Sequence, residues 1–251
     1  MNEALIFSDI DLDNFQTNKA SLKSKEIINQ VKSLRLKYGE NIILFDEKNQ
    51  RACAQIEAIK KNELIVSNIK KLKQNKIDSP EITLCQALPK AKKLDFIIQK
   101  TTELGINKII PFSSERSVPK LDESKEKKKT QRWQKIAIEA VRQSKLEHIP
   151  LVHDINSFEP LLKEFRKSKK TLKLFFWEEK KDISYTNIKH AIQMLPEYEK
   201  VVIVIGPEGG FSEMEANIAI ESGFKMVNLG KTVLRVETVS IVIMSLLKFL
   251  K

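Results

Sequence analysis

The sequence predicts two domains, a small domain of β-strands followed by an α/β domain with a mostly parallel sheet. Residues 34–70 contain short runs of alternating apolar and polar residues separated by turn-forming residues, which is typical of a small β-barrel. After Pro80, apolar runs of strand length alternate with segments that have apolar residues at helical spacing. Residues 70–80 are polar and rich in lysine, which indicates a linker. We expect the first domain at residues 1–73 and the second at residues 79–251.

In the first domain, the pattern predicts a series of short strands. Residues 42–46 form an apolar run, and residues 47–50 have the composition of a turn. Residues 52–59 alternate, which places one set on a common face: Ala52, Ala54, Ile56 and Ala58. Residues 63–69 supply a further strand of the expected barrel.

In the second domain, strands are expected at residues 81–88, 107–112, 173–177, 201–205 and 225–229, with helices between them. In the first helix, the residues at helical spacing are Leu94, Ile97, Ile98, Thr101 and Leu104. Gly105 follows them at the position where helices commonly end with a residue in the left-handed conformation. A later helix is amphipathic, with an apolar side of Trp133, Ile136, Ala137, Ala140 and Val141. Its opposite side carries Arg132, Lys135, Glu139 and Arg142. The last helix is expected from about residue 238 to residue 249.

The net charge of +11 favours a polyanionic partner, above all a nucleic acid. An alternative is that the lysine excess, which accompanies many Ile and Asn residues, reflects AT-rich coding. Only seven of the 44 cationic residues are arginine. Because lysine cannot reproduce the planar guanidinium fork, each arginine is a candidate for a geometric role.

Several classes of protein are disfavoured by the composition. Cys53 and Cys85 are the only cysteines and have no CxxC spacing, so redox chemistry, a zinc ribbon or a disulfide framework is not expected. The three histidines show no ligand spacing, so no metal site is expected. The first residues lack the features of a signal peptide, and no apolar run is long enough to span a bilayer. We therefore expect a cytoplasmic protein without a membrane segment.

A glycine-rich loop after a predicted strand is the first candidate site. It reads IGPEGGFS at residues 205–212 and follows the apolar run at residues 201–205. Open α/β sheets bind ligands beyond the carboxyl ends of their strands, and glycines let a ligand approach the backbone. The loop lacks the Lys-Ser/Thr pair of a Walker loop, and its GxxGG spacing differs from the dinucleotide GxGxxG. Ser212 and Glu215 have the spacing of a capping box, so a helix should start there, and a purely structural turn is the alternative.

The second candidate site is the segment LGKTVLRVET at residues 229–238, which opens the last helix. Here Arg235 stands two residues before Glu237, beyond the end of another predicted strand. The alternative interpretation is that Glu237 or Thr238 caps the helix while Arg235 lies on the surface.

Read together, these two loops resemble the signature loops of the RsmE family, the SPOUT-class methyltransferases that make N3-methyluridine in 16S ribosomal RNA. A third match runs from QALPK at residues 86–90 through QKTTELG at residues 99–105 to SERS at residues 114–117. A fourth is WQKIAIEA at residues 133–140 with Gln143 and Ser144. The matches are collinear and cover roughly residues 82–248.

The resemblance implies a fold, a cofactor and partners. The fold would be a SPOUT-type domain with a deep trefoil knot, preceded by a PUA-like β-barrel that binds RNA. The cofactor would be S-adenosylmethionine, and the residues that the resemblance assigns to it are Ile205, Gly206, Gly209, Leu229, Gly230, Leu234 and Thr238. The protein would act as a homodimer in rRNA processing and ribosome biogenesis, on 16S ribosomal RNA within the small ribosomal subunit.

The sequence also departs from the family pattern. Residues 27–35 read IINQVKSLR where the family has a histidine ahead of a Val-Leu-Arg-Leu segment. Lys145 follows Gln143-Ser144 where an arginine is usual, and Lys231-Thr232 follows Gly230 in place of Pro-Arg. These changes concern RNA contacts more than cofactor binding.

The implied reaction gives roles to particular residues. Removal of the N3 proton of uridine leaves negative charge on the two carbonyl oxygens, and Arg235 is the candidate to stabilise that charge. Glu237 would accept the proton or orient Arg235. Arg35, Arg116 and Arg142 would bind RNA phosphates, together with the lysines at positions 125, 127, 128 and 129. For the lysine run, a solvated loop is the alternative.

Two rival functions stay open at this point. One is a knotted methyltransferase with another target, such as a ribose 2′-hydroxyl or a transfer-RNA base. The other is a non-catalytic RNA-binding or assembly protein that has kept the fold.

Overall fold

The computed structural model describes residues 4–8, 10–12, 17–46, 48–73, 80–117, 123–177, 185–230 and 232–250. It divides into two compact units, residues 1–76 and residues 77–251. Residues 74–79 of the expected linker, Glu47 of the expected turn and Lys231 lie outside the described residues. Among the described helices, none has the length and apolar character that crossing a bilayer requires.

The first unit contains a mixed five-stranded sheet in the order β1-β3-β4-β5-β2. The strands are β1 (Ala4–Phe7), β2 (Lys19–Leu22), β3 (Asn41–Phe45), β4 (Arg51–Ile59) and β5 (Leu64–Leu72), with helix α1 (Lys25–Ser33) between β2 and β3. β1 pairs with β3 in parallel, and the other ladders are antiparallel. The ladders form one path from β1 to β2, and within the described residues no ladder joins these two end strands. The start of the expected linker was wrong, because β5 continues to Leu72.

The core of the first unit lies between the sheet and α1. Ala52, Ala54 and Ile56 of β4 are buried, as their alternation predicts, and they pack with apolar residues of α1 such as Ile27. Ala58 is only half-buried, because the register of β4 against β5 shifts between Ile56 and Ala58. Such a bulge rotates the side chains that follow it.

The second unit is built on a larger sheet whose described ladders are all parallel. Its order is β11-β13-β10-β12-β6-β7-β8, and β9 also pairs with β7. The strands are β6 (Glu81–Ala87), β7 (Lys108–Ser113), β8 (Leu151–Val152), β9 (Asn156–Ser157), β10 (Thr171–Phe176), β11 (Thr186–Asn187), β12 (Lys200–Ile205) and β13 (Lys225–Asn228). The helices are α2 (Lys93–Glu103), α3 (Glu123–Ser144), α4 (Phe158–Arg166), α5 (Ile188–Gln193), η1 (Leu195–Glu197), α6 (Glu213–Glu221) and α7 (Val236–Phe249). The predicted parallel α/β domain is therefore confirmed.

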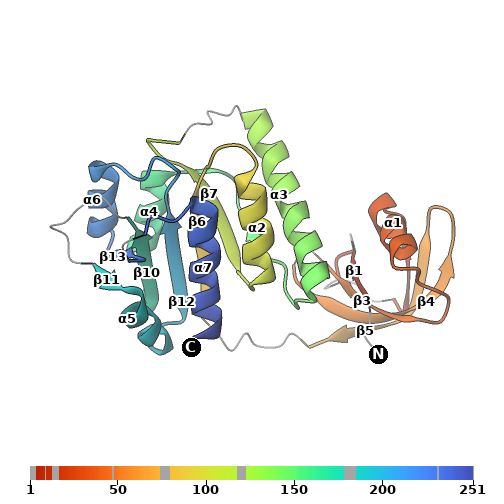
Figure 1. The fold of residues 1–251 in the computed structure, drawn as a ribbon. Helices are drawn as coiled ribbons and strands as arrows, with labels where there is room; N and C mark the ends of the chain where they lie inside the picture. The colour runs from red at the N-terminus through yellow and green to blue at the C-terminus, as the bar shows by residue number, and fades with distance from the viewer. Residues whose placement is uncertain are drawn as a thin grey trace. The chain divides into compact units, whose positions relative to one another are not determined.

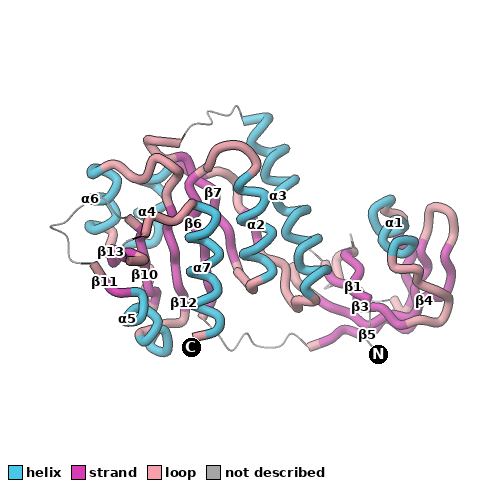
Figure 2. Tube along the Cα trace, in the orientation of Figure 1, coloured by secondary structure: helices cyan, strands magenta, loops and turns pink. Residues whose placement is uncertain are grey.

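Helices cover both faces of this sheet. Apolar residues of α2, α3, α5 and α7 share one core cluster with alternate strand residues such as Leu84 and Ile203. Residues of α4 and α6 share a second cluster with the strand residues that point the other way, such as Cys85 and Val204. Figure 1 shows α2, α3 and α7 side by side on one face, and Figure 2 shows the strands behind them. Burial on both faces explains why these strands are nearly continuous apolar runs.

The strand order decides where a ligand site can form. β10 pairs with β12 on one side and with β13 on the other, and their parallel carboxyl ends lie at one edge of the sheet. The two candidate loops leave this edge, the first after β12 and the second after β13. The fold therefore brings together two segments that the sequence places more than twenty residues apart.

Candidate functional site

A cavity of about 590 Å³ lies at the carboxyl ends of β10, β12 and β13. Its walls come mostly from the two candidate loops and the start of α7, with Phe176 and Trp177 from β10 and the residue that follows it. Its volume falls within the range of small-molecule and cofactor sites, and its position is the one that open parallel sheets use for ligands.

Most of the predicted cofactor residues line this cavity. Those that do are Ile205, Gly206, Gly209, Leu229 and Leu234, and the candidate catalytic residue Arg235 lines it as well. Gly230 and Thr238 are not among the lining residues. Gly230 follows Leu229 in the left-handed region, with φ +106°, and Thr238 lies half-buried in the first turn of α7.

The glycine loop after β12 packs against buried aromatic side chains. A Cβ atom on Gly206 would lie 3.0 Å from the ring of Phe211, which is tighter than nine in ten real Cβ contacts and would require the ring to shift. Phe211 is itself 1% exposed and packs against Phe175, with 4.3 Å between the ring centroids. The indole of Trp177 donates a hydrogen bond to the carbonyl of Phe211 at 3.3 Å. Gly206 is therefore required because the backbone passes directly over an aromatic ring.

The outer side of the same loop is held by residues 114–117. Arg116 donates a hydrogen bond from Nη1 to the carbonyl of Gly209 at 2.8 Å. The backbone N–H of Glu115 donates to the carboxylate of Glu215 at 2.9 Å. Glu215 also forms the predicted capping box with Ser212 at the start of α6, which is confirmed. Arg116 is exposed and was predicted as an RNA contact, and the structure shows that it also holds the glycine loop by a hydrogen bond.

Helix α7 begins earlier than predicted, at Val236 rather than at about residue 238. Arg235 occupies the N-cap position with extended backbone, φ −64° and ψ 150°, and its side chain makes no capping hydrogen bond. The alternative in which Glu237 or Thr238 caps the helix is wrong, because both lie inside its first turn. Arg235 is exposed, and its position beside the cavity leaves the guanidinium available to a ligand.

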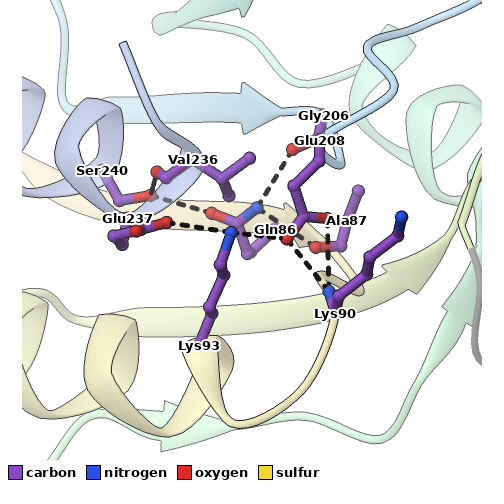
Figure 3. A network of polar contacts seen from close by, with 9 residues as sticks. All are labelled: Gln86, Ala87, Lys90, Lys93, Gly206, Glu208, Val236, Glu237 and Ser240. Carbon is purple, nitrogen blue, oxygen red and sulfur yellow. Dashed lines mark hydrogen bonds and ion pairs between the residues drawn. The ribbon is translucent and has the colours of Figure 1, made fainter.

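An ionic cluster that the sequence did not reveal joins α2 to both loops (Figure 3). Lys93 Nζ lies 2.8 Å from the carboxylate of Glu208 and 3.6 Å from Oε2 of Glu237. The longer distance is an ion pair without a hydrogen bond, and Oε2 of Glu237 is buried and has no hydrogen-bond partner among the described residues. Lys93 and Glu208 also line the cavity, whereas Glu237 does not.

Hydrogen bonds within this cluster shift the pKa values of Glu208 and Lys93. Burial alone would raise the pKa of Glu208, but hydrogen bonds from Lys93 and from the backbone N–H groups of Glu208 and Lys90 outweigh it, so the pKa is lowered. The hydrogen bond to Glu208 raises the pKa of Lys93, against a smaller effect of burial. Glu208 is therefore a carboxylate and Lys93 an ammonium at neutral pH, and the lowered pKa makes Glu208 a weaker base than a free carboxylate.

None of the three arginines predicted as RNA contacts lines the cavity. The side chain of Arg142 is 11% exposed and pairs with Glu139 at 2.6 Å, so its expected place on the exposed side of α3 is corrected. Arg35 is exposed and belongs to the first unit, where it follows α1 with φ 53°. In the lysine run, the side chains at positions 125, 127 and 128 are exposed, and that of Lys129 is half-buried.

The sequence missed other cavity residues for a topological reason. Phe176 and Trp177 follow the carboxyl-end rule, but only the strand order shows that β10 lies between β12 and β13. Lys93 comes from α2, more than a hundred residues before the loops, and no local pattern links it to them. Glu208 is the charged residue of the GxxGG loop, so the sequence could have predicted it as a polar residue of the site.

Comparison with family models gives two matches. The model of an RNA methyltransferase domain matches residues 77–248, and that of an RNA methyltransferase PUA domain matches residues 31–67. The first match covers well over half of the chain and includes every residue that lines the cavity.

Individual proteins are similar over nearly the whole chain. A ribosomal RNA small subunit methyltransferase E from Bacillus subtilis is 33% identical over 91% of this chain and 89% of its own length. The structure of a putative methyltransferase from Legionella pneumophila in complex with S-adenosylmethionine has a TM-score of 0.80 and 30% identity, covering 98% of this chain and 97% of the other. A ribosomal RNA small subunit methyltransferase E from Neisseria gonorrhoeae bound to S-adenosylmethionine has a TM-score of 0.77 and 28% identity, covering 99% and 98%.

Proposed function

The chain belongs to the RsmE family of RNA methyltransferases, and we propose that it transfers a methyl group from S-adenosylmethionine to N3 of a uridine in 16S ribosomal RNA. The observation that carries the proposal is the cavity between the two family loops, with the exposed guanidinium of Arg235 beside it. The names of the relatives support a small-subunit RNA as substrate, and the cofactor in the two similar structures supports S-adenosylmethionine.

The residues of the cavity fit this cofactor. Gly206 brings bare backbone to the wall, and Leu229 and Leu234 offer apolar surface on which an adenine can lie. The ion pair of Glu208 and Lys93 lies at the wall, so a carboxylate is available there to the cationic amine of the ligand and an ammonium to its carboxylate. When bound, the cofactor supplies an electrophilic methyl group on its sulfonium.

Arg235 has the position and the chemistry to stabilise the reacting base. In the transfer, the bond from N3 to the methyl carbon forms as the sulfur–carbon bond breaks, and the N3 proton leaves the uridine. The charge that develops on the uridine carbonyl oxygens faces a planar, permanently cationic guanidinium. Arg235 can reach these oxygens because its side chain is exposed and lines the cavity.

Glu237 has a narrower role than the sequence suggested. Its Oε2 is buried and lies 3.6 Å from Lys93, and the residue does not line the cavity. We therefore assign Glu237 to holding the start of α7, where an acidic residue in the first turn also interacts favourably with the helix dipole. Solvent or the RNA itself then takes the N3 proton.

RNA binding is assigned to surfaces of both units. In the first unit, Arg35 and Tyr38 are exposed on the segment after α1, and the side chain of Tyr38 is 79% exposed. In the second, the exposed lysines of α3 at positions 125, 127 and 128 add positive charge. We propose that the first unit is an RNA-binding PUA-like barrel, that the second is the catalytic domain, and that the protein works in the cytoplasm.

We further propose a homodimer and a trefoil-knotted path for the second unit, as the family resemblance implies. Helix α7 supports the dimer. Its buried residues, such as Ser240, Ile243 and Leu247, face the sheet and α2. Ile241, Val242 and Phe249 lie outside that set, and Phe249 is 67% exposed. An apolar stripe on the outer face of a helix needs a partner surface.

The function is tested by incubating purified protein with small ribosomal subunits or naked 16S RNA and S-adenosylmethionine, then digesting the RNA for mass spectrometry. We expect N3-methyluridine to appear at one position. A 2′-O-methyl nucleoside in the digest, or methylation that occurs only when transfer RNA is supplied as the substrate, would instead identify another target for the same chemistry. Absence of cofactor binding in calorimetry would identify a non-catalytic RNA-binding protein.

A further inference from the structure

Gln86 is a polar side chain in an otherwise apolar part of the sheet. It lies in β6, pairs in register with Ile205 of β12, and is 0% exposed. Its neighbours Cys85 and Ala87 point into the cluster with α4 and α6, so alternation directs Gln86 toward the α7 side. A buried primary amide is costly unless its donors and acceptor are all satisfied.

The amide nitrogen of Gln86 reaches the backbone where β12 ends. Nε2 lies 3.4 Å from the carbonyl of Ile205, 3.4 Å from that of Gly206 and 3.1 Å from that of Ala87. Ile205 and Gly206 both line the cavity. The donors of Gln86 therefore hold the first residues of the glycine loop from inside the sheet.

The amide oxygen of Gln86 reaches the other loop by way of α7. The hydroxyl of Ser240 donates to Oε1 of Gln86 at 2.8 Å, and the carbonyl of Val236 lies 3.1 Å from the same hydroxyl (Figure 3). Ser240 is 0% exposed. Val236 is the first residue of the helix and follows Arg235 directly.

We propose that Gln86 is a positioning residue that couples the cofactor loop after β12 to the Arg235-bearing start of α7. One planar amide is bonded to the loop directly and to Ser240 in the second turn of α7, so a displacement of the loop or of the helix strains a hydrogen bond to the other. Lys93 joins the same two segments at the cavity wall through Glu208 and Glu237, but these side chains are partly exposed and screened by solvent. The link through Gln86 and Ser240 is fully buried and therefore not screened by solvent. This inference rests on the proposed function only for its consequence, the alignment of methyl donor and uridine.

The test compares Ser240→Ala with Ser245→Ala in the cofactor-free protein by hydrogen–deuterium exchange. Both serines lie on α7 with the hydroxyl near the carbonyl four residues earlier, 3.1 Å for Ser240 and 2.9 Å for Ser245, but only Ser240 donates to Gln86. Ser240→Ala removes one oxygen atom and leaves the Gln86 oxygen unpaired. We expect exchange at the amides of residues 206 and 208–211 to rise about fivefold or more, because an unmade buried hydrogen bond has this order of effect.

Ser245→Ala should leave exchange in that loop unchanged, and Ser240→Thr, which keeps the hydroxyl, should restore the wild-type pattern. Gln86→Met, which preserves length without polar atoms, should loosen the same amides and weaken S-adenosylmethionine binding in calorimetry. The double variant Gln86→Met/Ser240→Ala should be no looser than Gln86→Met alone, because both changes break one link. If Gln86→Met does not fold, Ser240→Ala carries the test.

Exchange that rises only within α7 in Ser240→Ala would overturn the proposal, because the serine would then act in its own helix alone. Additive effects in the double variant would overturn it as well. The exchange measurements need no cofactor. A wild-type protein that fails to bind S-adenosylmethionine would therefore refute the proposed function without deciding the coupling.

Discussion

At the scale of single residues, the site depends on the guanidinium of Arg235 and on the absence of a side chain at Gly206. Arg235 brings a guanidinium to the cavity from a helix N-cap position, where its backbone is extended and its side chain is exposed. Gly206 has no side chain because the ring of Phe211 fills the space that a Cβ would need.

Replacing Arg235 with alanine should lower the rate of methyl transfer about 100- to 1000-fold, as when one charge-stabilising donor is removed from an active site. The affinity for S-adenosylmethionine should change little, because the cavity keeps its backbone walls. Single-turnover kinetics and calorimetry measure the two effects separately. Arg235→Lys is the matched variant and should recover only part of the rate, since an ammonium is not a bidentate donor. Full turnover in Arg235→Ala would remove this residue from the chemistry.

Gly206→Ala should weaken cofactor binding, because the added methyl group would sit 3.0 Å from the Phe211 ring and push the loop away. We expect an increase in Kd of about tenfold or more, equivalent to about 1.4 kcal/mol. Calorimetry with S-adenosylmethionine measures it. The double variant Gly206→Ala/Phe211→Leu makes room for the methyl group and should recover part of the affinity. Equal affinities in all these proteins would show that the close approach has no consequence.

These residues differ in how well the sequence could predict them. Gly206 and Arg235 stand in loops directly after strands, so local reasoning found both. Gln86 and Lys93 are brought to the same place only by the parallel order of β6, β12 and β10 and by the packing of α2 on α7. Long-range pairing of this kind leaves no signal in the spacing of one segment.

At the scale of elements, the strands of the large sheet begin in a charged cluster at the edge opposite the cavity. Glu81 of β6 accepts from Lys108 of β7 at 2.6 Å and lies 3.6 Å from Lys200 of β12. Burial on its own would raise the pKa of Glu81, but the hydrogen bond and the charge of Lys108, followed by the charge of Lys200, outweigh it, so the pKa is lowered from 4.5. The cluster therefore ties three adjacent strands together at their amino ends.

This shift predicts how stability depends on pH. The contribution of Glu81 is present above its unfolded pKa near 4.5 and is lost as pH falls through the lower folded value. Glu81→Gln should lower the free energy of unfolding at pH 7 by less than about 1 kcal/mol, because the cluster is partly exposed. Below the folded pKa, wild type and variant should be equally stable. Urea unfolding measured in steps from pH 7 to below pH 4.5 follows this. Glu103→Gln, in a local pair with Lys100 at the end of α2, is the matched control and should not lower the stability, because a negative charge there opposes the helix dipole. A difference between wild type and Glu81→Gln that does not shrink as the pH falls below 4.5 would contradict the linkage.

Element boundaries show where sequence reasoning reached its limit. The long apolar strands were predicted because burial on both faces makes them continuous apolar runs, and helices α2 and α3 because burial on one side imposes a helical period. Strands β8, β9 and β11 have two residues each, too few to show any period. The start of α7 was placed too late because Arg235 caps it through its backbone alone, without the side-chain bond that marks other helix starts.

At the scale of the whole molecule, the proposed homodimer can be tested in solution. The mass in solution by light scattering should be about twice the 28.9 kDa of one chain. Val242→Glu places a charge on the outer face of α7 and should shift the protein toward monomer, while Glu221→Gln on α6 should leave the mass unchanged. A monomeric wild type at micromolar concentration would refute the dimer and leave the chemistry of the single cavity standing.

The central claim is that the cavity at the ends of β10, β12 and β13 holds the methyl donor, and a crystal structure of the protein grown with S-adenosylmethionine tests it most directly. The account predicts density for the cofactor between Gly206 and Leu229, with the sulfonium methyl open toward the guanidinium of Arg235. Density at any other place, or a cavity that stays empty at millimolar cofactor, would contradict it.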